Sequence, residues 1–301
     1  MTRLVITLED VQLFWWLLQL RVLSIDQVRR LRYCHADGRL TAMRNVRKRL
    51  SRLRASGYLE AEGSDATTLV RTKVYRLGQK ALAPLRTHHG IEQRALYRSP
   101  GRSAQLQHDL LVSETAIRIT ESLRNRSVIT PPLAPLGMSF YTTRIVGNAG
   151  ERRHVERYVS QEDILIASEP RPLRIRPDLV FALADGEFSQ LYFLELDRGF
   201  ESAGQIAGKQ LAYHHFARVQ DGEKGEGSRM RWQRYLPDAR AFRVLFVTTS
   251  DRRVEGLRRK LHSVVGCERM AFTTIGRLQQ QDPVYDPIWV TWDGSRRSLM
   301  K

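Results

Sequence analysis

The sequence predicts a two-domain protein of mixed α/β class, in which a small helical domain with a β-hairpin precedes a larger domain of alternating strands and helices. The chain has 301 residues, a length that favours two domains over one. Near the N-terminus, apolar residues recur at helical spacing in three short segments. Farther on, short apolar runs of strand length alternate with amphipathic helical segments, which is typical of a mixed α/β domain.

Composition points to a polyanionic partner. The formal net charge is +17, and arginine outnumbers lysine, which suits bidentate contacts with phosphate and guanine. We therefore expect a nucleic-acid partner, with a merely basic surface or an anionic membrane surface as alternatives. No apolar stretch reaches the ~20 residues of a spanning helix, and no secretory signal is visible. Cys34 and Cys267 have neither zinc-site nor disulfide-framework spacing, so we expect a cytoplasmic protein with no membrane partner.

Residues 1–87 are predicted to form the first domain. Thr7 begins the first helix, whose first turn is acidic, as the helix dipole favours. Ser24 is the predicted N-cap of the second helix. A third helix is expected from about Thr41 to Ser56, ending at Gly57.

The third helix is amphipathic and strongly basic. Its apolar residues are spaced 3, 4 and 3 positions apart and form one stripe (Met43, Val46, Leu50 and Leu53). Six of the eleven residues from Arg44 to Arg54 are basic and none is acidic, whereas a solvated helix face normally mixes the two signs. The residues expected to contact DNA are Arg44, Arg47, Lys48, Arg49 and Arg52, with Arg71 and Lys73 in the next segment of the chain.

A strand, a polar turn-rich segment and a second strand come after the basic helix. They are expected at residues 58–59, 60–68 and 72–77, and a helix restarts at 78–85. In this order the segments resemble the winged helix-turn-helix family, which implies that the basic helix reads duplex DNA. Two other interpretations remain, a solvated bundle face and a winged helix that docks a protein.

The remainder of the chain is divided into a linker at residues 88–103, with a short helix at 91–97, and a second domain at 104–301. We expect a helix at 104–124 and strands at 139–146, 241–249 and 270–275. The segment 220–240 mixes basic and aromatic residues, including Trp232, which suits the stacking of single-stranded DNA; a surface loop is the alternative.

Acidic residues lie at the ends of two predicted neighbouring strands. Asp178 precedes one apolar run, and Glu195 and Asp197 end the next, two residues apart and so on one face. Lys209 and Tyr213 lie farther on, on one face of a predicted helix. Carboxylates are the ligands that Mg²⁺ prefers, and phosphodiester cleavage needs a cation at the phosphate. The pattern indicates a site for Mg²⁺ or Mn²⁺ with Asp178, Glu195 and Asp197 as ligands, although strand-end acids are often simply solvated.

This stretch resembles the core of the PD-(D/E)XK nuclease superfamily, which implies a restriction-endonuclease-like fold for residues 104–301. The resemblance departs at Asp197, where the motif has lysine. Three alternatives follow from this departure. Lys209 takes the place of that lysine, Asp197 serves as a third metal ligand, or the domain keeps the fold and has lost catalysis. Under the resemblance Lys209 stabilises the reacting phosphate, and Tyr213 is the candidate nucleophile of a covalent variant.

Three motifs also resemble the replication-relaxation family, which includes mobilisation-protein-C-type relaxases. They are Arg176-Pro177-Asp178, the run from Leu194 to Gly199, and Lys209 with Tyr213. The resemblance implies a metal-dependent DNA nickase or relaxase of a plasmid or mobile element, acting at an origin of transfer or replication. The alternative is a non-catalytic repressor or relaxosome subunit. The implied partners are double-stranded DNA, single-stranded DNA, relaxosome proteins and a second copy of the chain.

Overall fold

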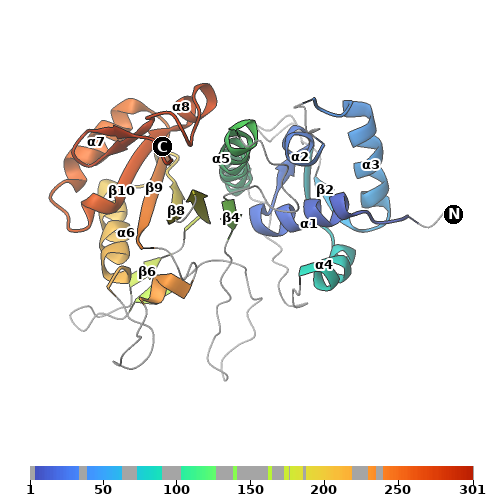
Figure 1. Cartoon of the computed structure of the whole chain (residues 1–301), viewed down its shortest axis with the longest axis horizontal. Helices are drawn as coiled ribbons and strands as arrows, with labels where there is room; N and C mark the ends of the chain where they lie inside the picture. The colour runs from blue at the N-terminus through green and yellow to red at the C-terminus, as the bar shows by residue number, and fades with distance from the viewer. Residues whose placement is uncertain are drawn as a thin grey trace, which may run out of the picture. The chain divides into compact units, whose positions relative to one another are not determined.

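The computed structural model (Figure 1) describes residues 4–33, 39–62, 73–89, 103–126, 138–140, 162–164, 173–175, 177–185, 188–218, 230–234 and 240–300. Its elements form two compact units, the first mainly Met1–Thr120 and the second mainly Val159–Lys301. Each unit combines helices with a β-sheet, so the predicted mixed α/β class is confirmed. Among the described residues, no helix has both the length and the apolar character needed to cross a membrane.

The first unit contains helices on a three-stranded sheet of order β1-β3-β2. Its elements are α1 (Leu8–Leu20), β1 (Leu23–Ser24), α2 (Ile25–Arg32), α3 (Met43–Ala55), β2 (Leu59–Glu62), β3 (Val74–Leu77), η1 (Gln79–Ala81), α4 (Leu82–His89) and α5 (Ser103–Arg126).

The first two helices begin at the residues that the sequence predicts. Thr7 caps α1, where it accepts a hydrogen bond from the backbone of Asp10 while the Asp10 carboxylate accepts one from the Thr7 backbone. Ser24 and Gln27 form the same reciprocal pair at the start of α2. Each capping box satisfies backbone N–H groups that have no partner inside the helix.

A close backbone approach links the end of α3 to the hairpin formed by β2 and β3. The two strands are antiparallel, with Leu59 opposite Leu77. Gly57 has φ of +79°, a left-handed conformation that favours glycine and ends the helix. Across the hairpin, a Cβ on Gly78 would lie 2.6 Å from the Gly57 carbonyl oxygen, so Gly78 also has no room for a side chain.

Helix α5 packs mainly with the first unit. Arg30 forms an ion pair with Glu114 at 2.8 Å, and the Ser113 hydroxyl donates to the Val22 carbonyl at 2.8 Å. Side chains of α5 thus satisfy polar groups of α2 and of the segment before β1. Residues through Thr120 belong to the first unit, and Glu121–Arg126 belong to the second. The domain boundaries expected from the sequence, with the linker at 88–103, stay a prediction.

The second unit is built on a seven-stranded sheet of order β12-β11-β10-β9-β8-β7-β4, accompanied by the hairpin β5-β6. Its elements are β4 (Met138–Phe140), β5 (Glu162–Ile164), β6 (Leu173–Ile175), β7 (Leu179–Asp185), β8 (Phe188–Leu196), α6 (Ala203–Phe216), η3 (Arg231–Arg234), β9 (Phe242–Thr248), α7 (Asp251–Leu261), η4 (Cys267–Arg269), β10 (Met270–Thr274), α8 (Ile275–Gln280), β11 (Trp289–Thr291) and β12 (Arg296–Arg297).

Three neighbouring strands, β8, β9 and β10, are parallel and are joined through α6 and α7. Strands buried by helices read as continuous apolar runs, and every residue of β10 is buried. Phe193 of β8, Phe246 of β9, Tyr213 of α6 and Leu257 of α7 belong to one core cluster. This packing fixes α6 and α7 over the strand ends that carry the acidic residues.

Several sequence expectations fall at the edges of the described residues. The strand expected at 139–146 is seen as β4, and its remaining residues lie outside the described ranges, as does the helix expected at 91–97. Trp232 is only 6% exposed and packs edge-on against Phe242, with ring centroids 5.6 Å apart. The interpretation of Trp232 as a base-stacking residue is therefore wrong, because its ring fills the core.

Candidate functional site

Pairing of β7 with β8 brings Asp178 beside the end of β8. The two strands are antiparallel, with Leu179 opposite Leu194. The backbone N–H of Asp178 donates to the Leu194 carbonyl at 2.9 Å, and the backbone N–H of Leu196 donates to the Asp178 carboxylate at 2.8 Å. Asp178, just before β7, is thus held by backbone groups of Leu194 and Leu196, the two neighbours of Glu195 in β8.

Glu195 lies at the centre of a buried polar group. Its side chain is 2% exposed. One oxygen accepts from Lys209 Nζ at 2.8 Å and the other from the Tyr213 hydroxyl at 2.7 Å. Lys209 also donates to Glu201 at 2.8 Å. The sequence-predicted pair on α6 therefore does point back over the strand end, and both of its members contact the same carboxylate.

The electrostatics of this group favour a proton on Glu195 at a higher pH than usual. Burial raises the pKa of Glu195 to about 7; the charge of Lys209 opposes that shift, and the charge of Asp178 adds to it. The pKa of Lys209 is raised above its usual value: burial opposes the shift, and the adjacent Glu195 and Glu201 carboxylates outweigh it. Lys209 is therefore a cation throughout the neutral range, while Glu195 titrates within it.

Asp197 faces a different set of partners. It is 1% exposed, and its carboxylate accepts from the Gly199 backbone at 2.8 Å, from Thr248 at 3.1 Å and from Arg253 Nε at 2.8 Å. Because β8 and β9 run parallel, their carboxyl ends bring Asp197 and Thr248 together, and the next helix, α7, supplies Arg253. The charge of Asp197 is balanced inside the protein.

The predicted metal ligands come together only in part. Asp178 is close enough to Glu195 for its charge to raise the pKa of Glu195, whereas Asp197 is hydrogen-bonded to Arg253 and Thr248. Within the described ranges, no three His, Cys, Asp or Glu residues are grouped as a metal site would need. The three carboxylates are not gathered into one ligand set in this arrangement, because Lys209 pairs with Glu195 and Arg253 pairs with Asp197. Binding of Mg²⁺ or Mn²⁺ stays a prediction.

In the first unit, α3 presents the predicted basic surface. Its apolar stripe is buried, since Val46, Leu50 and Leu53 are each 0% exposed. The side chains of Arg44, Arg47, Lys48 and Arg52 are exposed, and none forms an ion pair within the described part of the chain. Lys73, just before β3, is also exposed, and Arg71 lies outside the described residues.

Arg49 differs from the other cations of α3. Its guanidinium forms a two-pronged ion pair with Asp10, through Nε at 3.0 Å and through Nη2, which also donates to the Val5 carbonyl at 2.8 Å. The Asp10 side chain is completely buried. The hydrogen bond to Asp10 raises the pKa of Arg49 above its ordinary value. Arg49 thus binds α3 to the start of α1 rather than adding to the exposed basic surface.

Comparison with known families identifies the chain. The family model described as replication-relaxation matches residues 14–229, well over half of the sequence. The chain belongs to the replication-relaxation family. No match was found among curated proteins or among solved structures.

The matched range of this replication-relaxation protein spans both candidate sites, from the basic helix α3 to the Glu195 group. Sequence reasoning missed two residues that hold the strand-end acids in place, Glu201 and Arg253. Arg253 had a usable signal, because it lies three residues after Ser250, the N-cap of α7, and a helix that comes directly after a parallel strand begins at the same sheet edge as Asp197. Glu201 had none, since it lies in an irregular segment between β8 and α6.

Proposed function

We propose that this replication-relaxation protein binds duplex DNA through α3 and acts in the replication or relaxation of a plasmid or mobile element. The observation that supports the proposal best is the surface of α3, a helix without acidic residues. It presents five exposed cations that form no ion pair with the described residues: Arg44, Arg47, Lys48, Arg52 and Arg54. The antiparallel strands β2 and β3 after α3 support its description as a winged helix-turn-helix, with Lys73 beside the hairpin.

The chemistry of α3 makes the binding electrostatic in origin. Each cation that neutralises a DNA phosphate releases counterions, so affinity falls as salt rises. Arginine residues also pair with guanine in the major groove. A role in replication or relaxation implies a site-specific interaction, in which the phosphate contacts position the helix and a few side chains read bases.

Salt dependence tests this proposal. In a fluorescence-anisotropy titration with labelled duplex DNA, the logarithm of the affinity should fall with the logarithm of salt concentration with a slope near −5, for about six phosphate contacts. Arg44→Ala and Arg47→Ala should each make the slope shallower by about 0.9. Arg259→Ala, which removes an exposed charge from the second unit, is the matched control and should leave the slope nearly unchanged. An affinity that does not depend on salt contradicts the proposal.

A second candidate function, metal-dependent nicking, has support from the Glu195 group. Two carboxylates, Asp178 and Glu195, lie beside a lysine that stays charged, which suits a divalent ion and a phosphate that gains charge in the reaction. If a metal binds, Asp178 and Glu195 would hold it, and it would supply Lewis-acid activation of the phosphodiester. Lys209 would then have to leave Glu195 and turn its charge to the phosphate, while Tyr213 holds the carboxylate in place.

Plasmid relaxation distinguishes nicking from binding alone. Supercoiled plasmid that carries the cognate origin is incubated with the protein and Mn²⁺, and relaxation is compared with Asp178→Ala and with the exposed-acid control Glu255→Ala. Nicking predicts relaxation by the wild type and the control and its loss in Asp178→Ala. Relaxation that survives the Asp178 substitution excludes this site, and no relaxation by the wild type favours a repressor or relaxosome subunit.

A further inference from the structure

A cavity in the second unit adjoins the Asp197 group, since two partners of Asp197, Gly199 and Arg253, line it. It has a volume of about 370 Å³ and opens between α7 and the segment after β8, with Gly199, Thr249, Ser250, Arg253 and Lys260 among its lining residues. Ligand pockets commonly hold about 300–1,000 Å³, so the volume suffices for a small polar group. No acidic residue of the described chain lines it.

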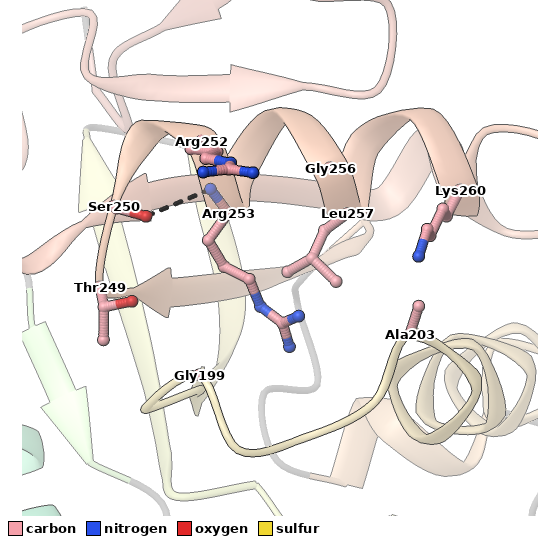
Figure 2. Close-up of a pocket in the computed structure, with 9 residues that line it drawn as sticks. All are labelled: Gly199, Ala203, Thr249, Ser250, Arg252, Arg253, Gly256, Leu257 and Lys260. Atoms are coloured by element: carbon pink, nitrogen blue, oxygen red, sulfur yellow. Dashed lines mark hydrogen bonds between the residues drawn. The ribbon is translucent and has the colours of Figure 1, made fainter.

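The lining of the cavity is suited to an anion. Figure 2 shows that Arg253 and Lys260 extend from α7 toward the segment between Gly199 and Ala203, and that the Thr249 and Ser250 hydroxyls lie at one end. Lys260 is exposed and forms no ion pair with the described residues. Three cations, Arg252, Arg253 and Lys260, and two hydroxyl groups line this opening, and they match the donors that bind phosphate oxygens.

Arg253 is held in a fixed position at this opening. Its Nε donates to Asp197 at 2.8 Å, and its Nη2 donates to the Glu201 carbonyl. Within the described part of the chain, Nη1 makes no further hydrogen bond, so it remains available to a ligand. A guanidinium that is already oriented loses less freedom when it binds a ligand.

An exposed aromatic residue directly follows the lining residue Gly199 in the sequence. Phe200 is 81% exposed and directly follows Gly199 of the lining, and consecutive Cα atoms are about 3.8 Å apart. Arg198 lies over the ring, with Cζ 5.2 Å from its centroid. Among the described residues Phe200 is the most exposed large apolar side chain. An exposed ring beside cations is the combination on which unpaired bases stack.

We propose that this surface binds single-stranded DNA, with a backbone phosphate in the cavity beside Lys260 and Arg253 and a neighbouring base stacked on Phe200. The proposal rests on DNA binding as the proposed function and adds a second, strand-specific site to it. In a duplex the bases are paired and stacked on one another, so a lone ring can stack only on a base that has left the helix. The combination of a phosphate cavity with an exposed ring therefore favours a single strand.

Binding of labelled oligothymidylate by the full chain tests the proposal, again by fluorescence anisotropy. Phe200→Ala should raise the Kd at least about 5-fold, as expected for the loss of one stacked base. Lys260→Ala should weaken binding and make the slope of log affinity against log salt shallower by about 0.7, the value for one phosphate of a single strand. Arg259→Ala, one residue before Lys260 on the same helix but outside the lining, should retain the wild-type Kd within about 2-fold.

Duplex DNA measured with the same variants separates this inference from the proposed function. The expected result is that Phe200→Ala and Lys260→Ala bind duplex like the wild type, while Arg47→Ala loses duplex affinity only. If the wild type binds single-stranded DNA but not duplex DNA, the proposed function of α3 is contradicted, whereas the single-strand site is not. Equal losses for both DNA forms in Phe200→Ala, or wild-type Kd values in both cavity variants, overturn it.

Competition identifies the source of the phosphate. Inorganic phosphate and thymidine monophosphate are titrated against bound oligothymidylate. The proposal expects displacement only at concentrations far above that of unlabelled oligothymidylate. A mononucleotide that competes as well as the oligonucleotide would show that the cavity takes a free nucleotide, and would overturn the single-strand assignment.

Discussion

Burial of the Glu195 carboxyl group links the stability of the fold to pH. It is fully buried, contacts Lys209 and Tyr213 directly, and has a pKa of about 7. In the unfolded chain its pKa is the ordinary value near 4.5. Between these two values the folded state binds the proton more tightly than the unfolded state, so stability falls as pH rises through this window.

Glu195→Gln tests this linkage, because glutamine cannot titrate. Urea denaturation at pH 4.5 and at pH 7.5 should show that the wild type loses up to about 3 kcal/mol of unfolding free energy relative to Glu195→Gln between the two pH values, at ~1.4 kcal/mol per pKa unit. Glu255→Gln, on the surface of α7, is the control and should show no such difference. A wild type and Glu195→Gln with parallel pH profiles would contradict the raised pKa.

At the level of single residues, the sequence indicates one half of the acidic site well. Asp178, Glu195, Lys209 and Tyr213 follow from local rules, since strand-end positions and a four-residue helical spacing decide where they lie. The partnership of Asp197 with Arg253 does not follow, because it depends on the parallel pairing of β8 with β9. Two residues 56 positions apart meet there, and no local pattern specifies such a meeting.

At the level of elements, α3 combines two kinds of arginine that the sequence does not distinguish. Arg47 is exposed, while Arg49 pairs with buried Asp10. Both residues lie outside the apolar stripe of the helix, so helical periodicity does not distinguish them. Only the tertiary contact of Arg49 with Asp10, in the first turn of α1, gives Arg49 its partner.

Parallel substitutions separate these two roles. Arg47→Ala should reduce duplex affinity and leave the unfolding free energy nearly unchanged. Arg49→Ala leaves a buried carboxylate without its cation and should cost about 1–3 kcal/mol of unfolding free energy. Urea denaturation and duplex titration of both variants measure the contrast. A stable Arg49→Ala with reduced affinity would show instead that Arg49 acts mainly on DNA.

The ends of helices are easier to predict from sequence than the tertiary contacts of the residues within an element. The start of the first helix at Thr7, the N-cap Ser24 and the helix end at Gly57 are predicted and confirmed, and the structure adds that Thr7 is itself an N-cap. Capping and left-handed glycine are local chemistry. The prediction of base stacking for Trp232 is wrong, because an aromatic residue in a solvent-facing loop and one in a core can have the same neighbours in sequence. Contact with Phe242 decides between them.

At the level of the whole molecule, the net charge and the family are the basis of the proposed DNA-directed role, and each unit contributes its own surface to that proposal. The first unit has the cations of α3, and the second has the Glu195 group and the cavity beside α7. The mixed α/β class follows from the alternation of apolar segments. The packing of α5 with the first unit does not follow from the sequence pattern. The predicted linker at 88–103 places that helix in the second domain.

If α3 binds DNA as proposed, the ion pair between Asp10 and Arg49 has a consequence for how the protein finds its target. A genome offers a vast excess of nonspecific sites, and every unpaired cation lengthens the time spent on them. By neutralising Arg49 inside the fold, Asp10 lowers the number of charges that α3 offers to any phosphate backbone while it strengthens the fold. Selection for faster search and selection for a firmly held helix would then act on the same carboxylate in the same direction.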